Sequence, residues 1–193
     1  MKANEAAIAK GEVVVLYLDE CHLIWQDACG YVWGPRSERI ELSIASQRER
    51  QSYYGAINAM TGDRIVIPCD CADGRWTMIF IELLRQEFEG KRIIICWDGA
   101  SYHCGEEMRD YLEGVNMGKS REEWPITCVR FAPYAPEQNP IENVWLQAKE
   151  FVRKHWYECK VFQHVLDLFE RALDTITFDF DRLRMYMPDL QLI

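Results

Sequence analysis

Long uncharged hydrophobic runs are absent from the sequence. No window approaches the roughly eighteen apolar residues that a membrane-spanning helix needs, and residues 1–6 lack the apolar core of a secretory signal peptide. Internal repeats and low-complexity segments are also missing. These absences argue against a membrane protein, a secreted protein and a repeat protein, and we expect the chain to be cytoplasmic.

Positive charge is scarce. The chain has 22 lysines and arginines against 31 aspartates and glutamates, which gives a net charge of -9. This excess of acid argues against a protein whose whole surface clamps nucleic acid. It still allows nucleic-acid chemistry at a local site, because bound metal ions reverse the sign of a carboxylate cluster.

Cysteines at zinc-binding spacing are also missing. The sulfurs of Cys69 and Cys71 are too close in sequence for a zinc knuckle, and no second Cys or His pair stands at ligand spacing. Others, such as Cys96 and Cys128, lie inside apolar runs. The eight cysteines therefore indicate buried thiols in a reducing compartment and not a disulfide scaffold.

The chain is long enough for one domain with its own hydrophobic core. It has 193 residues, of which 49% are hydrophobic and 12% aromatic, a composition typical of a folded protein. We expect a single domain over residues 1–193, with residues 1–11 as a short lead-in and residues 178–193 as a C-terminal tail.

Five apolar runs predict β-strands. The first, residues 13–18, is unbroken and typical of a strand buried on both faces, and it stops at Asp19-Glu20. A turn at residues 61–63 separates the second and third runs, which indicates an antiparallel pair. The later strands are expected at residues 51–60, 64–68, 91–98 and 126–131.

Four segments carry apolar residues at the spacing of an amphipathic helix. We expect Asn139 to be the N-cap of the third helix, with Pro140 at its first position. The predicted helices cover residues 74–88, 103–112, 140–156 and 161–176, with irregular stretches at 21–40 and 114–125. Strands and helices in this order predict a mixed α/β fold.

The two most apolar strands each end at an aspartate, Asp19 and Asp98. If these strands are central, adjacent and parallel, both acids lie at the same edge of the sheet, where ligands of open α/β sheets collect. Like charges placed so close repel each other unless a cation lies between them. Magnesium suits such carboxylates, and a third acid, Glu142, would complete a site for two metal ions.

Each of these residues also has a structural interpretation. Glu142 falls three residues after Asn139, where a capping-box glutamate belongs. Asp19 and Asp98 could be strand-end acids that face solvent, and His103 could cap the helix that it starts. The residue pattern by itself leaves these alternatives open.

Three segments occur in order: Leu18-Asp19-Glu20, then Trp97-Asp98-Gly99-Ala100-Ser101-Tyr102-His103, then the stretch from Pro133 to Trp145. Together they resemble the catalytic domain of a DDE transposase of the mariner-related bacterial insertion-sequence family. The third segment is the most specific, because its prolines, Asn139, Glu142 and Trp145 all fall in the family pattern. Trp145 itself is expected to pack in the core and fix its helix.

The resemblance implies a ribonuclease H-like fold, an α/β structure with a five-stranded mixed sheet flanked by helices, whose first, fourth and fifth strands are parallel. It implies that Asp19, Asp98 and Glu142 bind two Mg²⁺ or Mn²⁺ ions, one activating the nucleophile and one stabilising the leaving 3′-oxygen. The reaction would nick the ends of a DNA element and transfer the freed 3′-hydroxyl to target DNA. His103 and Asn139 would position phosphate or a metal-bound water.

The resemblance also implies DNA as partner, and dimers on paired ends. The family's N-terminal helix-turn-helix module has no counterpart before the first strand, so we expect recognition of element ends to belong to a separate part. Lys149, Arg153, Arg36 and Arg39 are candidates for DNA contacts, although the residue pattern favours a solvated helix face for Lys149 and Arg153. Two other functions remain open: a non-catalytic remnant that binds a partner, and a ribonuclease H-like nuclease without strand transfer.

Overall fold

One five-stranded sheet organises the chain. The computed structural model describes residues 4–29, 34–35, 37, 49–132 and 138–178. The strand order is β3-β2-β1-β4-β5, with β1, β4 and β5 parallel and β2 and β3 antiparallel to their neighbours. The strands are β1 Val13–Ile24, β2 Arg50–Asn58, β3 Arg64–Cys69, β4 Arg92–Trp97 and β5 Ile126–Arg130. This order and these directions confirm the predicted mixed sheet.

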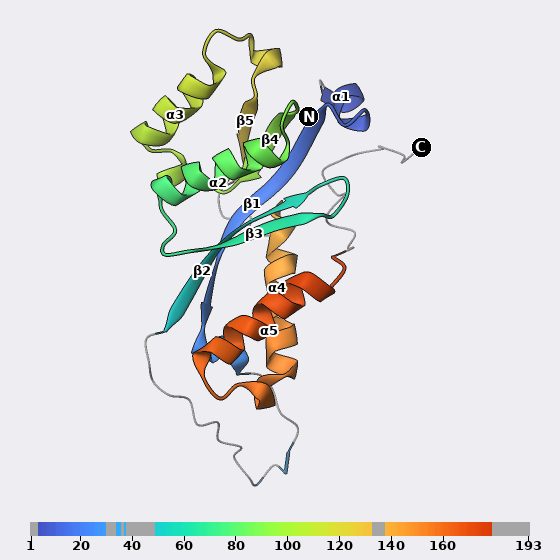
Figure 1. The fold of residues 1–193 in the computed structure, drawn as a ribbon, viewed down its shortest axis with the longest axis vertical. Helices are drawn as coiled ribbons and strands as arrows, with labels where there is room; N and C mark the ends of the chain where they lie inside the picture. The colour runs from blue at the N-terminus through green and yellow to red at the C-terminus, as the bar shows by residue number, and fades with distance from the viewer. Residues whose placement is uncertain (1–3, 30–33, 36, 38–48, 133–137, 179–193) are drawn as a thin grey trace.

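Helices cover both faces of the sheet. In Figure 1, α2 and α3 lie on one side of it and α4 and α5 on the other. These helices are α2 Gly74–Glu87, α3 Glu106–Asn116, α4 Ile141–Lys154 and α5 Phe162–Thr175. Shorter pieces are α1 Glu5–Ala9 and the 3-10 helices η2 Trp25–Ala28, η3 Ser101–His103, η4 Arg121–Glu123 and η6 Trp156–Glu158.

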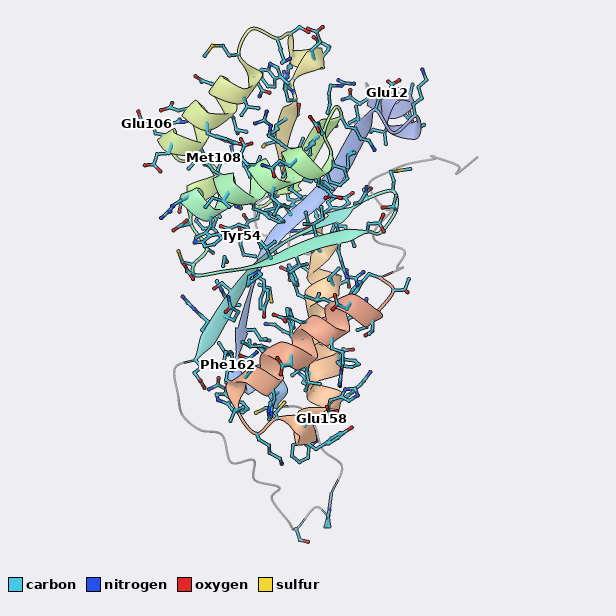
Figure 2. The ribbon with its side chains drawn as sticks, viewed as in Figure 1. Glu12, Tyr54, Glu106, Met108, Glu158 and Phe162 are labelled. Carbon is cyan, nitrogen blue, oxygen red and sulfur yellow. The ribbon has the colours of Figure 1, made fainter. Side chains whose placement is uncertain are left out.

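Alternate residues of β1 belong to two hydrophobic clusters on opposite faces of the sheet. The odd-numbered residues from Val13 to Tyr17 pack with α4 and α5, and the even-numbered residues from Val14 to Leu18 pack with α2 and α3. Figure 2 shows side chains between the sheet and the helices on both of its faces. Burial on both faces explains why this strand is an unbroken apolar run.

The first strand is longer than predicted. The prediction that it ends at Asp19-Glu20 is wrong, because β1 pairs with β2 as far as the pair Ile24–Arg50. Residues 21–24 alternate between buried and exposed, as expected for a strand with one covered face. Asp19 therefore lies inside β1, and the expected irregular stretch at 21–40 begins instead with strand and 3-10 helix. Most of the rest of that stretch lies outside the described residues.

The second predicted helix is displaced along the chain. Residues 101–103 form a separate 3-10 helix, and α3 begins at Glu106 after Gly105. It continues to Asn116, whose side-chain amide donates to the Ile126 carbonyl at 3.0 Å and accepts from the Ile126 N–H at 3.3 Å. This two-way bond to β5 holds the end of α3 against the sheet and shortens the predicted loop at 114–125.

Asn139 does not cap α4 with its side chain. The helix has Pro140 at its N-cap position and no side-chain cap bond. The Asn139 amide nitrogen instead donates to the Leu18 carbonyl of β1 at 3.1 Å. The capping prediction is therefore wrong, and the capping-box interpretation of Glu142 loses its partner.

Two further features of the described residues bear on the sequence predictions. No helix in the described part of the chain is long and apolar enough to span a bilayer. All eight cysteines are free thiols; three of them are buried, as predicted, and the other five are only partly buried.

Candidate active site

Asp19 and Asp98 lie at the same level of two neighbouring parallel strands. The last paired residues of β1 and β4 are Tyr17 and Cys96, and each aspartate follows two residues later. Because β4 ends at Trp97 while β1 continues, Asp98 leaves the sheet as Asp19 stays within it. Asp19 is partly buried on the α4 side, and the Asp98 side chain is 56% exposed.

Glu142 approaches Asp19 from the first turn of α4. Burial raises the pKa of Asp19 well above its ordinary value, and the nearby charges of Glu142, Glu20 and Asp98 raise it further. The side chain of Glu142 is exposed as a whole, but its carboxylate is partly withdrawn from water, which raises the pKa of Glu142 while a hydrogen bond with Asp19 opposes the rise. Asp19 and Glu142 therefore lie close enough to affect each other's pKa, and Asp98 is close enough to act on both.

Residues that follow β4 hold the carboxylate of Asp98 in place. Its Oδ1 atom accepts the Ala100 N–H at 2.9 Å and lies 3.0 Å from His103 Nδ1. The imidazole of His103 is buried and stacks on the Trp97 ring with centroids 4.4 Å apart. His103 is therefore an orienting partner of Asp98 and does not start a helix, because η3 ends there.

Glu20 is a site residue whose role the sequence did not reveal. Its side chain is 6% exposed, and Oε1 lies 3.2 Å from His103 Nε2 while Oε2 accepts the Tyr102 hydroxyl at 3.1 Å. Because side chains alternate along a strand, Glu20 faces away from Asp19. That alternation was the available signal, but it depends on knowing that β1 continues past Asp19.

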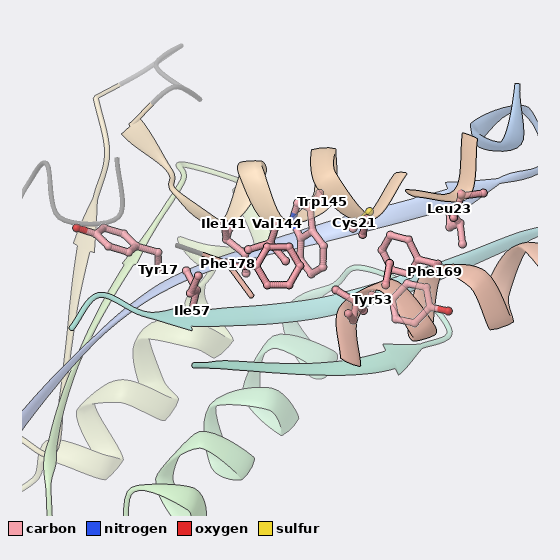
Figure 3. Packing of buried hydrophobic residues seen from close by; sticks show 14 of the residues in the cluster. Tyr17, Cys21, Leu23, Tyr53, Ile57, Ile141, Val144, Trp145, Phe169 and Phe178 are labelled. Atoms are coloured by element: carbon pink, nitrogen blue, oxygen red, sulfur yellow. The ribbon is translucent and has the colours of Figure 1, made fainter. Parts of the chain in front are cut away.

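Trp145 contacts Asp19 directly. Its ring is buried in the cluster under α4, as predicted, and its Nε1–H also donates to Asp19 Oδ2 at 3.2 Å. Figure 3 shows Ile141, Val144 and Trp145 pointing from α4 towards the sheet. The sequence indicated the packing of this indole but not its hydrogen bond.

Asn139 contacts the strand that carries Asp19. It is 4% exposed, and its Nδ2 bond to the Leu18 carbonyl ties the start of α4 to β1, one residue before Asp19. Its Oδ1 is buried with no hydrogen-bond partner in the described part of the chain. The contact that this residue makes is with the strand that carries the first acid.

Of the four residues predicted to contact DNA, two lie on α4 next to an acid and two are outside the described residues. Lys149 donates to the His22 carbonyl at 2.9 Å and lies 3.3 Å from an oxygen of Asp27, and Arg153 lies 4.0 Å from the same oxygen. Both cations are thus partly neutralised on α4. Arg36 and Arg39, the other two candidates, lie outside the described residues.

The donor set suits a divalent cation. Asp19, Asp98 and Glu142 are carboxylates, the ligands that Mg²⁺ and Mn²⁺ prefer, and their mutual repulsion is a cost that a cation would remove. Across the described ranges, no three His, Cys, Asp or Glu side chains already converge as a ligand group. The three acids therefore lie at one edge of the sheet, but their side chains do not converge on a single coordination site.

Comparison with solved structures places the fold among integrase cores. The chain of a simian T-cell lymphotropic virus intasome complex matches with a TM-score of 0.56 at 9% identity, over 92% of this chain and 55% of that one. The BIV integrase catalytic core matches at 0.50 and 12% identity over 86% of both chains, and the HTLV-2 integrase core in complex with magnesium at 0.50 and 12% over 83% of both. Such low identity shows the fold alone, which is ribonuclease H-like. This chain spans about half the length of the simian virus chain.

A family model assigns the chain more narrowly. The model described as DDE superfamily endonuclease matches residues 14–161, a range that begins in β1 and ends after α4 and so includes all three acids. The chain therefore belongs to the DDE superfamily endonuclease family. Among curated proteins, no match is found.

Proposed function

We propose that the chain is the catalytic domain of a DNA transposase of the mariner-related bacterial insertion-sequence family, which nicks element ends and transfers the freed 3′-hydroxyl to target DNA. Membership of the DDE superfamily endonucleases supports the reaction class. The single observation that carries the proposal is that Asp19 and Asp98 follow the last paired residues of two adjacent parallel strands, at the same edge of the sheet. The charges of Glu142 and Asp98, which both raise the pKa of partly buried Asp19, agree with this placement. Acids held together at such cost are typical of a functional site.

In this proposal Asp19, Asp98 and Glu142 hold two Mg²⁺ or Mn²⁺ ions. When bound, the ions supply activation of the attacking oxygen and neutralisation of the leaving oxygen. Trp145 keeps Asp19 in place, and the Ala100 N–H holds one oxygen of Asp98.

Other residues act around the acids. His103 orients Asp98, and Asn139 anchors the start of the helix that carries Glu142. Lys149 and Arg153 meet DNA phosphates, as do Arg36 and Arg39, and a second copy of the chain completes the assembly on paired DNA ends.

A metal titration followed by a cleavage assay tests the proposal. We expect isothermal titration calorimetry to detect Mn²⁺ binding that is lost in Asp98→Ala. With Mn²⁺ present, DNA from the ends of the element that encodes the chain should be nicked and then joined to a target plasmid. Absence of Mn²⁺ binding, or binding that Asp98→Ala leaves unchanged, would contradict the catalytic assignment.

One observation favours a second candidate. No three ligands converge across the described residues, which is what a non-catalytic remnant acting as a binding module would also show. That candidate predicts neither metal binding nor nicking. Nicking without joined product would instead identify a ribonuclease H-like nuclease that lacks strand transfer.

A further inference from the structure

A glycine of β2 makes room for the indole of Trp145. Gly55 is the cross-strand partner of Asp19. A Cβ atom added to Gly55 would overlap Cη2 and Cζ2 of Trp145 and would lie 3.0 Å from Cδ1 of Ile141. The backbone of Gly55 does not have a positive φ, so the requirement for glycine is the space that the indole occupies.

The same indole contacts one acid and is carried by the helix of another. Its Nε1–H donates to Asp19 Oδ2 at 3.2 Å, and Trp145 follows Glu142 by three residues, on the same face of α4. The ring is 4% exposed and stacks near Phe169 of α5, with centroids 6.3 Å apart. The position of the ring therefore couples the position of α4 to that of Asp19.

We infer that Trp145 is a positioning residue for Asp19, and that Gly55 of β2 provides the space that the Trp145 ring needs. The N–H of Trp145 fixes Oδ2 of Asp19, and the ring sets how closely α4 brings Glu142 to Asp19. The expected effect on metal affinity rests on the proposed metal-dependent function, whereas the hydrogen bond between Trp145 and Asp19 does not. Mutation of residues that hydrogen-bond to metal-binding side chains commonly weakens metal affinity by about 10-fold or more.

A purely structural role would need only the ring. Phenylalanine keeps an aromatic side chain at the centre of the cluster and removes only the N–H and part of the ring area. The comparison of Trp145→Phe with an ordinary core truncation therefore separates orientation from packing. Val152→Ala serves as the control, because Val152 is buried in the same cluster two turns further along α4.

The first measurement observes the bond in the metal-free protein. Of the seven tryptophans, Trp145 is identified as the indole N–H cross-peak that disappears from the ¹H–¹⁵N spectrum in Trp145→Phe. We expect that cross-peak to move in Asp19→Asn and on addition of Mg²⁺, and to stay in place in Val152→Ala. A cross-peak that is unmoved by Asp19→Asn would overturn the inference, whether or not the protein binds metal.

The second measurement is the affinity for Mn²⁺. We expect Trp145→Phe to weaken Mn²⁺ binding about 10-fold and Val152→Ala to leave it unchanged despite a loss of thermal stability. Gly55→Ala should weaken binding similarly, and Trp145→Phe provides the test should that variant fail to fold. Wild-type affinity in Trp145→Phe would overturn the positioning role. If the wild-type protein binds no Mn²⁺, the proposed function fails while the spectrum still decides the bond to Asp19.

Discussion

His103 lies between Asp98 and Glu20, with one ring nitrogen 3.0 Å from the first carboxylate and the other 3.2 Å from the second. Both ring nitrogens face carboxylate oxygens, so the imidazole has a partner on each side. One of these acids is exposed and the other buried. The imidazole therefore joins the edge where we place the metal ions to the core between the sheet and α2.

Removing that imidazole should destabilise the fold. In His103→Ala, the Tyr102 hydroxyl is the one side-chain partner that the described residues leave to the buried carboxylate of Glu20. We expect a loss of about 2–4 kcal/mol in the free energy of unfolding. Urea denaturation measures the loss. In the double variant His103→Ala with Glu20→Gln, part of the stability should return, because the uncompensated charge is gone; equal losses in the single and double variants would contradict this account.

Removing the charge of Asp19 should stabilise the metal-free protein. The folded-state pKa of this acid is raised above its ordinary value of 3.8, so the folded chain binds a proton more tightly than the unfolded chain. Its contribution to stability is fully present below the ordinary value and is lost as pH rises through the folded value. At neutral pH, in the presence of a chelator, Asp19→Asn should therefore be more stable than the wild type by about 1 kcal/mol.

Melting temperatures at several pH values check this prediction. The gap between Asp19→Asn and the wild type should widen from pH 4 towards pH 7. Asp63→Asn is the matched control, since Asp63 lies in the exposed turn after β2. A wild type that is more stable than Asp19→Asn at neutral pH without metal would show that the charge of Asp19 is compensated by some other means.

Much of the sheet could be predicted from local pattern, because β4 stops where its apolar run stops, at Trp97. The end of β1 could not, since it depends on pairing with β2, a segment distant in sequence. The same holds for Asn139, whose side chain bonds to Leu18 across 121 positions of the chain. The three acids were recognisable from their motifs, whereas the Trp145–Asp19 bond and the contact of Glu20 with His103 became apparent only through contacts across the fold.

The role of Lys149 in DNA binding can be separated from its ion pair with Asp27. If it contacts phosphate, Lys149→Gln should weaken binding of duplexes of unrelated sequence to a similar extent, and the slope of log affinity against log salt should fall by about 0.9. Fluorescence anisotropy at several salt concentrations measures both. Lys154→Gln, at an exposed position on the same helix, is the control; a reduced melting temperature with unchanged DNA binding would restrict Lys149 to its bonds with Asp27 and His22.

The cysteines of the sheet should resist alkylation in the native protein. Burial raises the pKa of each of the Cys21, Cys96 and Cys128 thiols from 9.0 to about 12. Because the thiolate is the reactive form, a rise of this size leaves about a thousandfold less of it at pH 8.

Iodoacetamide treatment at pH 8, followed by mass spectrometry of peptides, checks this prediction. Cys29 and Cys104, which are only partly buried, should be modified first, and all eight cysteines should react at similar rates in denaturant. Native-state modification of Cys96 as fast as that of Cys29 would mean that β4 opens readily. In that case Asp98, which immediately follows β4, would lack the rigid support that the proposed metal site requires.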